Sequence, residues 1–124
     1  MMRILLLDDS VDNLNLLKIY AKKSQDDFTM VSKSDEAMSL LQKECFDLFF
    51  LDIQMPGKDG FEVLESVREI KNGKELFICA LTAHTSKDEV EKIQSSSFDD
   101  YLKKPILRED FLNYIEKYSV KAAG

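Results

Sequence analysis

The sequence is poor in the residues that build disulfide frameworks and zinc sites. It contains two cysteines, Cys45 and Cys79, and one histidine, His84, in 124 residues. The two cysteines have no paired spacing, and Cys79 lies in an apolar run typical of a protein core. A disulfide scaffold and a zinc site are therefore disfavoured, and a reducing compartment is expected. We predict a cytoplasmic location.

An excess of positive charge is also missing. The formal net charge is −6 at pH 7, and the sequence pI is about 4.8. Nucleic acids and anionic membranes select basic surfaces, so we expect no direct binding to either. Long hydrophobic runs are absent as well: the apolar residues 4–7 near the N-terminus are too few for a signal peptide or a membrane span.

The chain does contain enough apolar material for a core. Apolar residues make up 44% of the sequence and charged residues 32%, which is typical of a globular protein. No repeat, linker or low-complexity tract interrupts the pattern. We therefore predict a single domain over residues 1–124.

Short apolar runs alternate with amphipathic segments along the whole chain. We expect strands over residues 3–7, 28–32, 47–51, 75–81 and 100–104, and helices over residues 12–24, 34–44, 60–71, 86–95 and 107–119. Ser34 and Ser86 are predicted to cap the second and fourth helices. Continuous apolar strands indicate burial on both faces, so the pattern predicts a doubly wound α/β fold with a five-stranded parallel sheet in the order 2-1-3-4-5 and five helices.

Polar residues follow several of the predicted strands. In this strand order Asp8, Asp9, Asp52, Thr82 and Lys104 all lie at the carboxyl edge of the sheet, where open parallel sheets bind ligands. Three clustered carboxylates repel one another, and a divalent cation relieves the repulsion. An all-oxygen site of this kind suits magnesium. A carboxylate beside a metal, a lysine and a hydroxyl can attack a phosphoryl group.

Four motifs carry a resemblance that covers essentially the whole chain. They are "LLLDD", "LDIQMPGKDG", "ALTA" and "DDYLKKPI", in this order. Together they resemble the receiver domain of response regulators in two-component signalling. The resemblance implies a flavodoxin-like fold and a phosphoacceptor switch, not a conventional enzyme, that catalyses its own phosphorylation and dephosphorylation.

The resemblance also implies roles for individual residues. Asp52 would accept the phosphoryl group in a reaction that needs Mg²⁺ or Mn²⁺. The metal ligands would be Asp8 (directly or through water), Asp9, Asp52 and the backbone carbonyl of Gln54. Thr82 and Lys104 would contact the phosphoryl oxygens, and Pro105 would follow a cis peptide bond. Thr82 and Tyr101 would form the switch, and Gln54 and His84 would border the path of the hydrolytic water and tune the phosphoryl lifetime.

Simpler interpretations remain open for some of these residues. Thr82 could be an ordinary hydroxyl at a strand end, Tyr101 could serve only in strand packing, and His84 could be an exposed loop residue. Ser97 stands where the family usually has glycine, and a left-handed conformation there would cost about 1 kcal/mol.

The expected partners are a histidine kinase or histidine phosphotransfer protein and an unknown downstream protein target. No effector domain is expected after residue 119, so the chain would be a stand-alone regulator, a relay intermediate or an excised domain. Two other functions are weighed against this one. The acidic "DDSVDN" segment would repel the phosphate of a flavin, and a degenerate receiver used only for docking would not need all of these polar residues.

Overall fold

The computed structural model describes residues 1–57 and 59–123, with side chains described up to residue 119. Lys58, which belongs to the "LDIQMPGKDG" motif, lies outside the described residues, as does Gly124 at the end of the predicted domain.

A five-stranded parallel sheet forms the centre of the structure. Its strands are β1 (Arg3–Leu7), β2 (Asp27–Val31), β3 (Leu48–Asp52), β4 (Phe77–Thr82) and β5 (Asp100–Lys103). They are hydrogen-bonded in the order β2-β1-β3-β4-β5, and every neighbouring pair is parallel. The predicted strand order and direction are confirmed, and the order reverses between β1 and β3.

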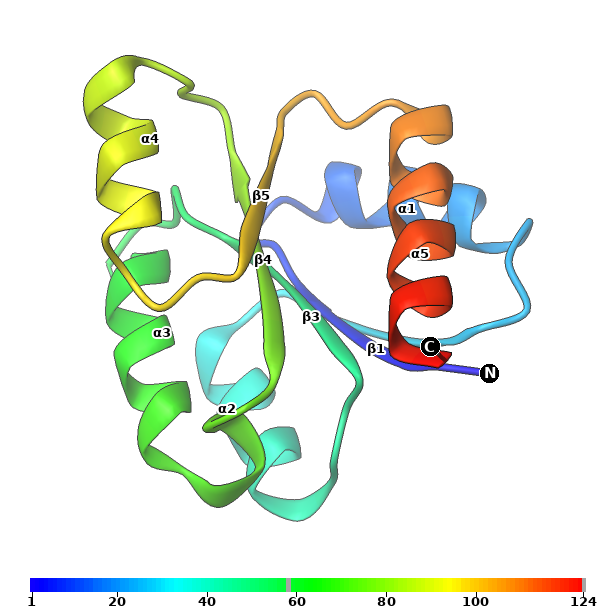
Figure 1. The fold of residues 1–124 in the computed structure, drawn as a ribbon, viewed down its shortest axis with the longest axis horizontal. Coiled ribbons are helices and arrows are strands. Elements are labelled where there is room, and N and C mark those ends of the chain that lie inside the picture. Colours follow the sequence, from blue (N-terminus) through cyan, green and yellow to red (C-terminus); the bar gives the residue numbers. More distant parts are fainter. Residues whose placement is uncertain (58, 124) are drawn as a thin grey trace.

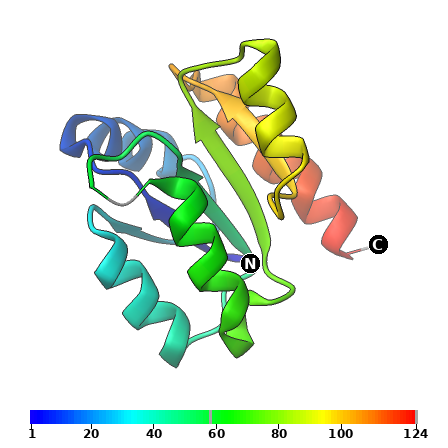
Figure 2. The same ribbon diagram turned by 90° about the vertical axis from the view of Figure 1, so that its left-hand side faces the viewer.

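Five α-helices cover the two faces of the sheet. They are α1 (Val11–Ala21), α2 (Ser34–Lys43), α3 (Gly60–Glu69), α4 (Lys87–Gln94) and α5 (Arg108–Ala123), with a short 3-10 helix η1 at Lys71–Gly73. Helices α1 and α5 pack on one face and α2, α3 and α4 on the other, as Figure 1 shows. Figure 2 shows α2 and α3 side by side. The doubly wound α/β fold is therefore confirmed.

The apolar runs are continuous because each strand feeds two separate cores. In β3, Phe49 and Leu51 belong to the cluster under α2, α3 and α4, whereas Leu48 and Phe50 belong to the cluster under α1 and α5. All four side chains are fully buried. Successive side chains of a strand point to opposite faces, so a strand covered on both sides must be apolar at every position. The ring of Phe50 lies 5.3 Å from that of Phe111 in α5.

One of the two predicted helix caps is correct. Ser86 caps α4, and its hydroxyl accepts a hydrogen bond from the backbone N–H of Glu89. The prediction for Ser34 is wrong, because Lys33 occupies the extended N-cap position and makes no side-chain cap hydrogen bond. Ser34 is already the first helical residue of α2.

The left-handed conformation that would have been costly at Ser97 does not occur. Among the described residues, none other than glycine has a positive φ. The chain instead leaves α4 through Ser95, which has a φ of −86°. The hydroxyls of Ser95 and Ser96 donate to the backbone carbonyls of Lys92 and Ile93. These hydrogen bonds satisfy carbonyl groups that a left-handed glycine cap would otherwise serve.

Within residues 1–57 and 59–123, no helix has the length and apolarity that crossing a lipid bilayer requires.

Two glycines shape the loop that leaves β3. Gly57 has a φ of +84°, a conformation that residues with a side chain rarely adopt. Gly60 begins α3 directly against the end of β3. A Cβ atom on Gly60 would lie 2.6 Å from the backbone oxygen of Asp52 and 2.6 Å from the Cα of Ile53. The absence of a side chain at position 60 therefore lets α3 start beside Asp52.

We predict that Gly60→Ala lowers the free energy of unfolding by about 1–3 kcal/mol, because the new methyl group meets backbone that has to shift. The backbone amide signals of Asp52 and Ile53 should move in an NMR spectrum. Gly57→Ala is the matched control: its Cβ would contact nothing within 4 Å, so it should cost about 1 kcal/mol through φ alone and leave those signals in place. Equal perturbation of Asp52 by both variants would contradict this account.

Candidate functional site

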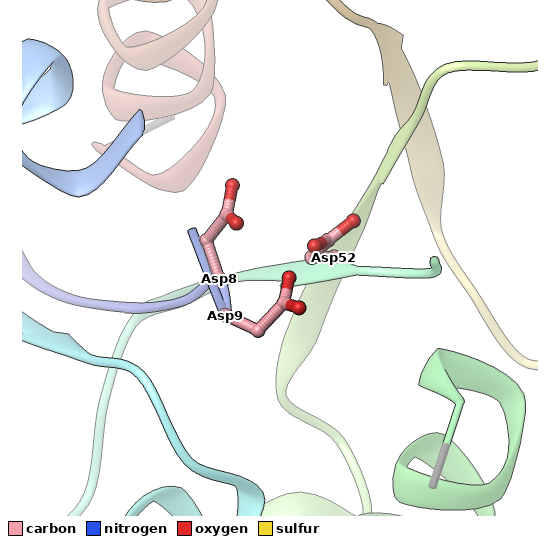
Figure 3. A group of neighbouring side chains, drawn as sticks. All are labelled: Asp8, Asp9 and Asp52. Atoms are coloured by element: carbon pink, nitrogen blue, oxygen red, sulfur yellow. The ribbon is translucent and has the colours of Figure 1, made fainter. Parts of the chain in front are cut away.

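Three carboxylates gather at the carboxyl ends of two neighbouring strands. Asp8 and Asp9 follow β1, and Asp52 is the last residue of β3. One oxygen from each of these side chains lies within 4.8 Å of the others, and Figure 3 shows the three side chains together. Asp8 and Asp52 are buried, whereas Asp9 is exposed. The convergence predicted from the strand order is confirmed for these residues.

Lys104 brings a positive charge into this cluster. Its Nζ lies 2.8 Å from Oδ1 of Asp52 and 3.3 Å from Oδ2 of Asp8. The backbone N–H of Lys104, directly after β5, donates to the carbonyl of Thr82 at 2.7 Å. The Lys104–Pro105 peptide bond is cis, as predicted. The side chain of Lys104 thus extends from the end of β5, past β4, to Asp52 at the end of β3.

The two oxygens of Asp52 have different surroundings. Oδ1 accepts hydrogen bonds from Lys104 Nζ and, at 3.2 Å, from the backbone N–H of Gln54. Oδ2 is buried and has no hydrogen-bond partner among the described residues. A buried polar atom without a partner is costly in a folded protein and calls for an explanation. Oδ2 of Asp52 is therefore free, among the described residues, to take a ligand or form a bond.

The position of Asp52 also raises its pKa. Burial is the largest cause, the hydrogen bond from Lys104 opposes it, and the charge of Asp8 raises the pKa further. The result is a pKa of about 7, compared with an ordinary value of 3.8. Burial therefore outweighs the stabilisation that Lys104 gives to the ionised carboxylate of Asp52.

Lys104 itself remains protonated. Burial alone would lower the pKa of its ammonium group, but the hydrogen bonds and charges of Asp52 and Asp8 outweigh burial and raise the pKa above 10.5. Lys104 can therefore serve as a fixed positive charge and hydrogen-bond donor throughout the physiological pH range.

Asp8 is held by groups that the sequence analysis did not identify. The backbone N–H of Ser10 donates to Oδ1 of Asp8 at 2.9 Å, and the side-chain amide of Asn13 lies 3.4 Å from Oδ2. Ser10 also caps α1. The signal for Ser10 was present in the sequence, as a serine just before a helix. The contact from Asn13 depends on how α1 sits against β1.

Thr82 ends β4 with its hydroxyl in a network of hydrogen bonds. The side chain is buried, and its Oγ1 donates to the carbonyl of His84 and accepts from the N–H of His84, both at 3.0 Å. Nε2 of Gln54 lies 3.3 Å from the same oxygen. Thr82 therefore belongs to the site edge, but its hydroxyl is engaged with the loop that follows β4.

The remaining predicted residues lie around this edge. The side chain of His84 is exposed on the loop between β4 and α4. Tyr101 is half-buried in β5 and packs against the core cluster under α2, α3 and α4. Their proposed roles in phosphoryl lifetime and switching stay predictions.

The donor set fits a hard divalent cation. Three carboxylates supply oxygen ligands, and exposed Asp9 leaves access from solvent. Mg²⁺ prefers oxygen ligands with several positions left for water or substrate. The site can therefore combine a metal, a nucleophilic carboxylate and a fixed ammonium group.

A comparison with protein families decides the assignment. The family model described as "Response regulator receiver domain" matches residues 4–116. The chain belongs to the response regulator receiver domain family. Membership agrees with the phosphoacceptor switch predicted from the motifs and with the fold.

Relatives of this receiver domain include short and long proteins. An uncharacterized 14.6 kDa protein encoded in the sodA1 3′ region of Leptolyngbya boryana is 34% identical, over 94% of this chain and 89% of that protein. The sensor protein GacS of Pseudomonas syringae pv. syringae is 34% identical over 94% of this chain, but the chain spans 13% of its length.

The receiver domain also matches solved structures. The chemotaxis protein CheY4 of Vibrio cholerae superimposes with a TM-score of 0.87 and 25% sequence identity, covering 95% of this chain and 98% of that one. The strand order and helix arrangement described above are therefore those of a known receiver fold.

The raised pKa of Asp52 makes a prediction about the metal-free receiver. The folded protein keeps a proton on Asp52 up to about pH 7, whereas the unfolded chain releases it near pH 3.8. The free energy of unfolding should therefore fall as the pH rises through this window. Asp52→Asn lacks this titration. In a chelating buffer, its free energy of unfolding relative to that of the wild type should therefore be roughly 1–3 kcal/mol higher at pH 8 than at pH 5. Urea unfolding at both pH values measures the gap, and an equal gap would contradict the burial argument.

Proposed function

We propose that Asp52 accepts a phosphoryl group from a phosphohistidine on a partner histidine kinase or histidine phosphotransfer protein. The observation that carries this proposal is the asymmetry of the Asp52 carboxylate. Lys104 and the backbone of Gln54 hold Oδ1, while Oδ2 is buried and has no partner in the described part of the chain. The first oxygen orients the group, and the second is available as the nucleophile.

In the proposed step, Oδ2 of Asp52 forms a bond to phosphorus while the P–N bond to the donor imidazole breaks. The electron pair of that bond returns to the ring nitrogen, which takes up a proton. Lys104 donates to the phosphoryl oxygens where negative charge accumulates, and it moves little, because it already lies 2.8 Å from Asp52. Hydrolysis of the acyl phosphate resets the switch, and we propose that Gln54 and His84 tune its rate.

Asp8, Asp9, Asp52 and the backbone carbonyl of Gln54 would hold Mg²⁺ or Mn²⁺. When bound, the cation offsets the charge of the three carboxylates and of the incoming phosphoryl group. Ser10 and Asn13 would keep Asp8 oriented for this role through their contacts to its carboxylate.

The proposed output is a rearrangement of the face formed by α4, β5 and α5. Thr82 would turn its hydroxyl toward the phosphoryl group, and Tyr101 would follow from β5. A downstream protein would read the altered face. GacS and the other sensor-kinase relatives support a place in a phosphorelay, and the small Leptolyngbya protein supports a stand-alone regulator. We propose that the chain is a single domain over residues 1–124 and that it acts in the cytoplasm in either of these two roles.

We expect acetyl phosphate to label the wild type with one phosphoryl group, read as added mass, only when Mg²⁺ is present. Excess chelator should abolish labelling, because the carboxylates then repel the donor. Asp52→Asn should block labelling completely. Asp47→Asn is the control, since Asp47 is an exposed carboxylate before β3. Labelling that survives in the Asp52→Asn variant would contradict the assignment of the acceptor.

We predict that Thr82→Ala retains most of the labelling but weakens the change in the output face. The hydroxyl can sense the phosphoryl group without taking part in the attack, and couplings of this kind are about 1–3 kcal/mol. The measurement is the NMR shift of the Tyr101 amide with and without the phosphoryl group. Thr82→Ser keeps the hydroxyl and should behave as the wild type. A full shift in Thr82→Ala would remove Thr82 from the switch.

A further inference from the structure

The side chain of Gln54 connects the two loops that border the candidate site. Its Oε1 accepts a hydrogen bond from the backbone N–H of Ala83 at 3.0 Å. Its Nε2 lies 3.3 Å from Oγ1 of Thr82 and 3.5 Å from Oε1 of Glu89 in the first turn of α4. One amide on the loop after β3 thus contacts the end of β4, the following loop and α4.

The hydrogen-bonding capacity of the Thr82 hydroxyl is used up by these contacts. A threonine hydroxyl has one proton to donate and two lone pairs that accept. The proton is donated to the carbonyl of His84, and the lone pairs face the N–H of His84 and the amide of Gln54. Thr82 must therefore give up existing bonds before it can donate to anything on Asp52.

Ala83 is held in the same way. Its N–H is the donor next in sequence to Thr82, and its partner is Oε1 of Gln54. A phosphoryl group on Asp52 would present three acceptor oxygens near these two donors. The amide oxygen of Gln54 and the carbonyl of His84 now occupy the donors that such a group would use.

We propose that Gln54, through its bonds to Thr82, Ala83 and Glu89, is a latch that competes with the phosphoryl group for the donors of the loop after β4. This inference rests on the proposed function and concerns its regulation. The Gln54 latch stabilises the unphosphorylated arrangement, and phosphorylation pulls Ala83 and Thr82 away from it. Release also ends the contact to Glu89, which frees the first turn of α4 on the output face.

The latch differs from control of phosphoryl lifetime by side-chain bulk. Bulk would act on the access of water to a phosphoryl group that is already present. The latch acts on the equilibrium between the two loop arrangements, so it affects any ligand that imitates the phosphoryl group, including one that is not hydrolysed. Gln54 acts here through Thr82 and Ala83 and is a positioning residue.

Beryllofluoride is such a ligand, since it binds an aspartate carboxylate in the presence of Mg²⁺ and imitates the phosphoryl group. We expect Gln54→Met, which keeps the length and removes the hydrogen bonds, to bind beryllofluoride about five- to tenfold more tightly, as the loss of one or two competing hydrogen bonds implies. Gln54→Ala should change affinity in the same direction. Both leave the backbone carbonyl of Gln54 in place. The matched control is Gln42→Met, the same change at an exposed position of α2.

A second measurement follows the latch itself. In the wild type without beryllofluoride, the Ala83 N–H should exchange with solvent slowly, because Gln54 accepts its hydrogen bond. In Gln54→Met it should exchange at least several times faster, and beryllofluoride should restore slow exchange in that variant. In the wild type, exchange should stay slow with and without beryllofluoride. If Gln54 had a merely structural role, beryllofluoride would not restore the protection of the Ala83 N–H from exchange in Gln54→Met.

Each outcome decides between the proposals. Tighter binding by both Gln54 variants, with faster exchange at Ala83, supports the latch. Unchanged or weaker binding by both variants, with normal binding by the wild type, overturns the latch and leaves the proposed function intact. A gain in Gln54→Ala alone would assign the effect to bulk and also overturn it. Failure of the wild type to bind beryllofluoride and to be labelled by acetyl phosphate would refute the proposed function and the latch with it.

Discussion

The ammonium group of Lys104 between the buried carboxylates of Asp8 and Asp52 is the interaction on which the site depends. Each carboxylate alone would be costly to bury, and together they repel. Lys104 compensates part of this cost, at 2.8 Å from one carboxylate and 3.3 Å from the other. The pKa of Asp52 is raised to about 7, mainly by burial, so Lys104 does not offset the whole of this cost. A divalent cation at the site would offset the remaining negative charge.

Buried strands β3 and β4 supply Asp52 and Thr82 to the site, and the loops after β1 and β5 supply Asp8, Asp9 and Lys104. Strand β3 is buried along its whole length, so the backbone of Asp52 has little freedom. Gly60 brings the start of α3 against the same residue. The loop after β4, by contrast, is exposed from Ala83 to Ser86 and is held largely by side-chain hydrogen bonds. A fixed acceptor beside a loop held in this way is the combination that a switch requires.

The fold was predictable because its signals are local and repeated. Buried strands such as β3 and β4 are continuous apolar runs, which parallel sheets covered on both faces require. The errors fall at element ends. Ser34 was one residue too late to be the cap of α2, and Ser97 needed no left-handed backbone because neighbouring serine hydroxyls satisfy the end of α4. Such details depend on a few dihedral angles that residue type alone constrains weakly.

The sequence by itself determined the alternation of strands and helices, and it placed the carboxylates together once the order 2-1-3-4-5 was assumed, because strand ends in a parallel sheet meet at one edge. The end of the fifth predicted strand also indicated the position of Lys104, and the resemblance to receiver domains implied the cis bond before Pro105. Only the tertiary structure decided which oxygen of Asp52 is free, how far burial raises its pKa, and that Asn13 contacts Asp8. It alone revealed that Gln54 reaches Thr82, Ala83 and Glu89. These contacts join residues 28 to 35 positions apart, and their geometry comes from packing, which no local propensity encodes.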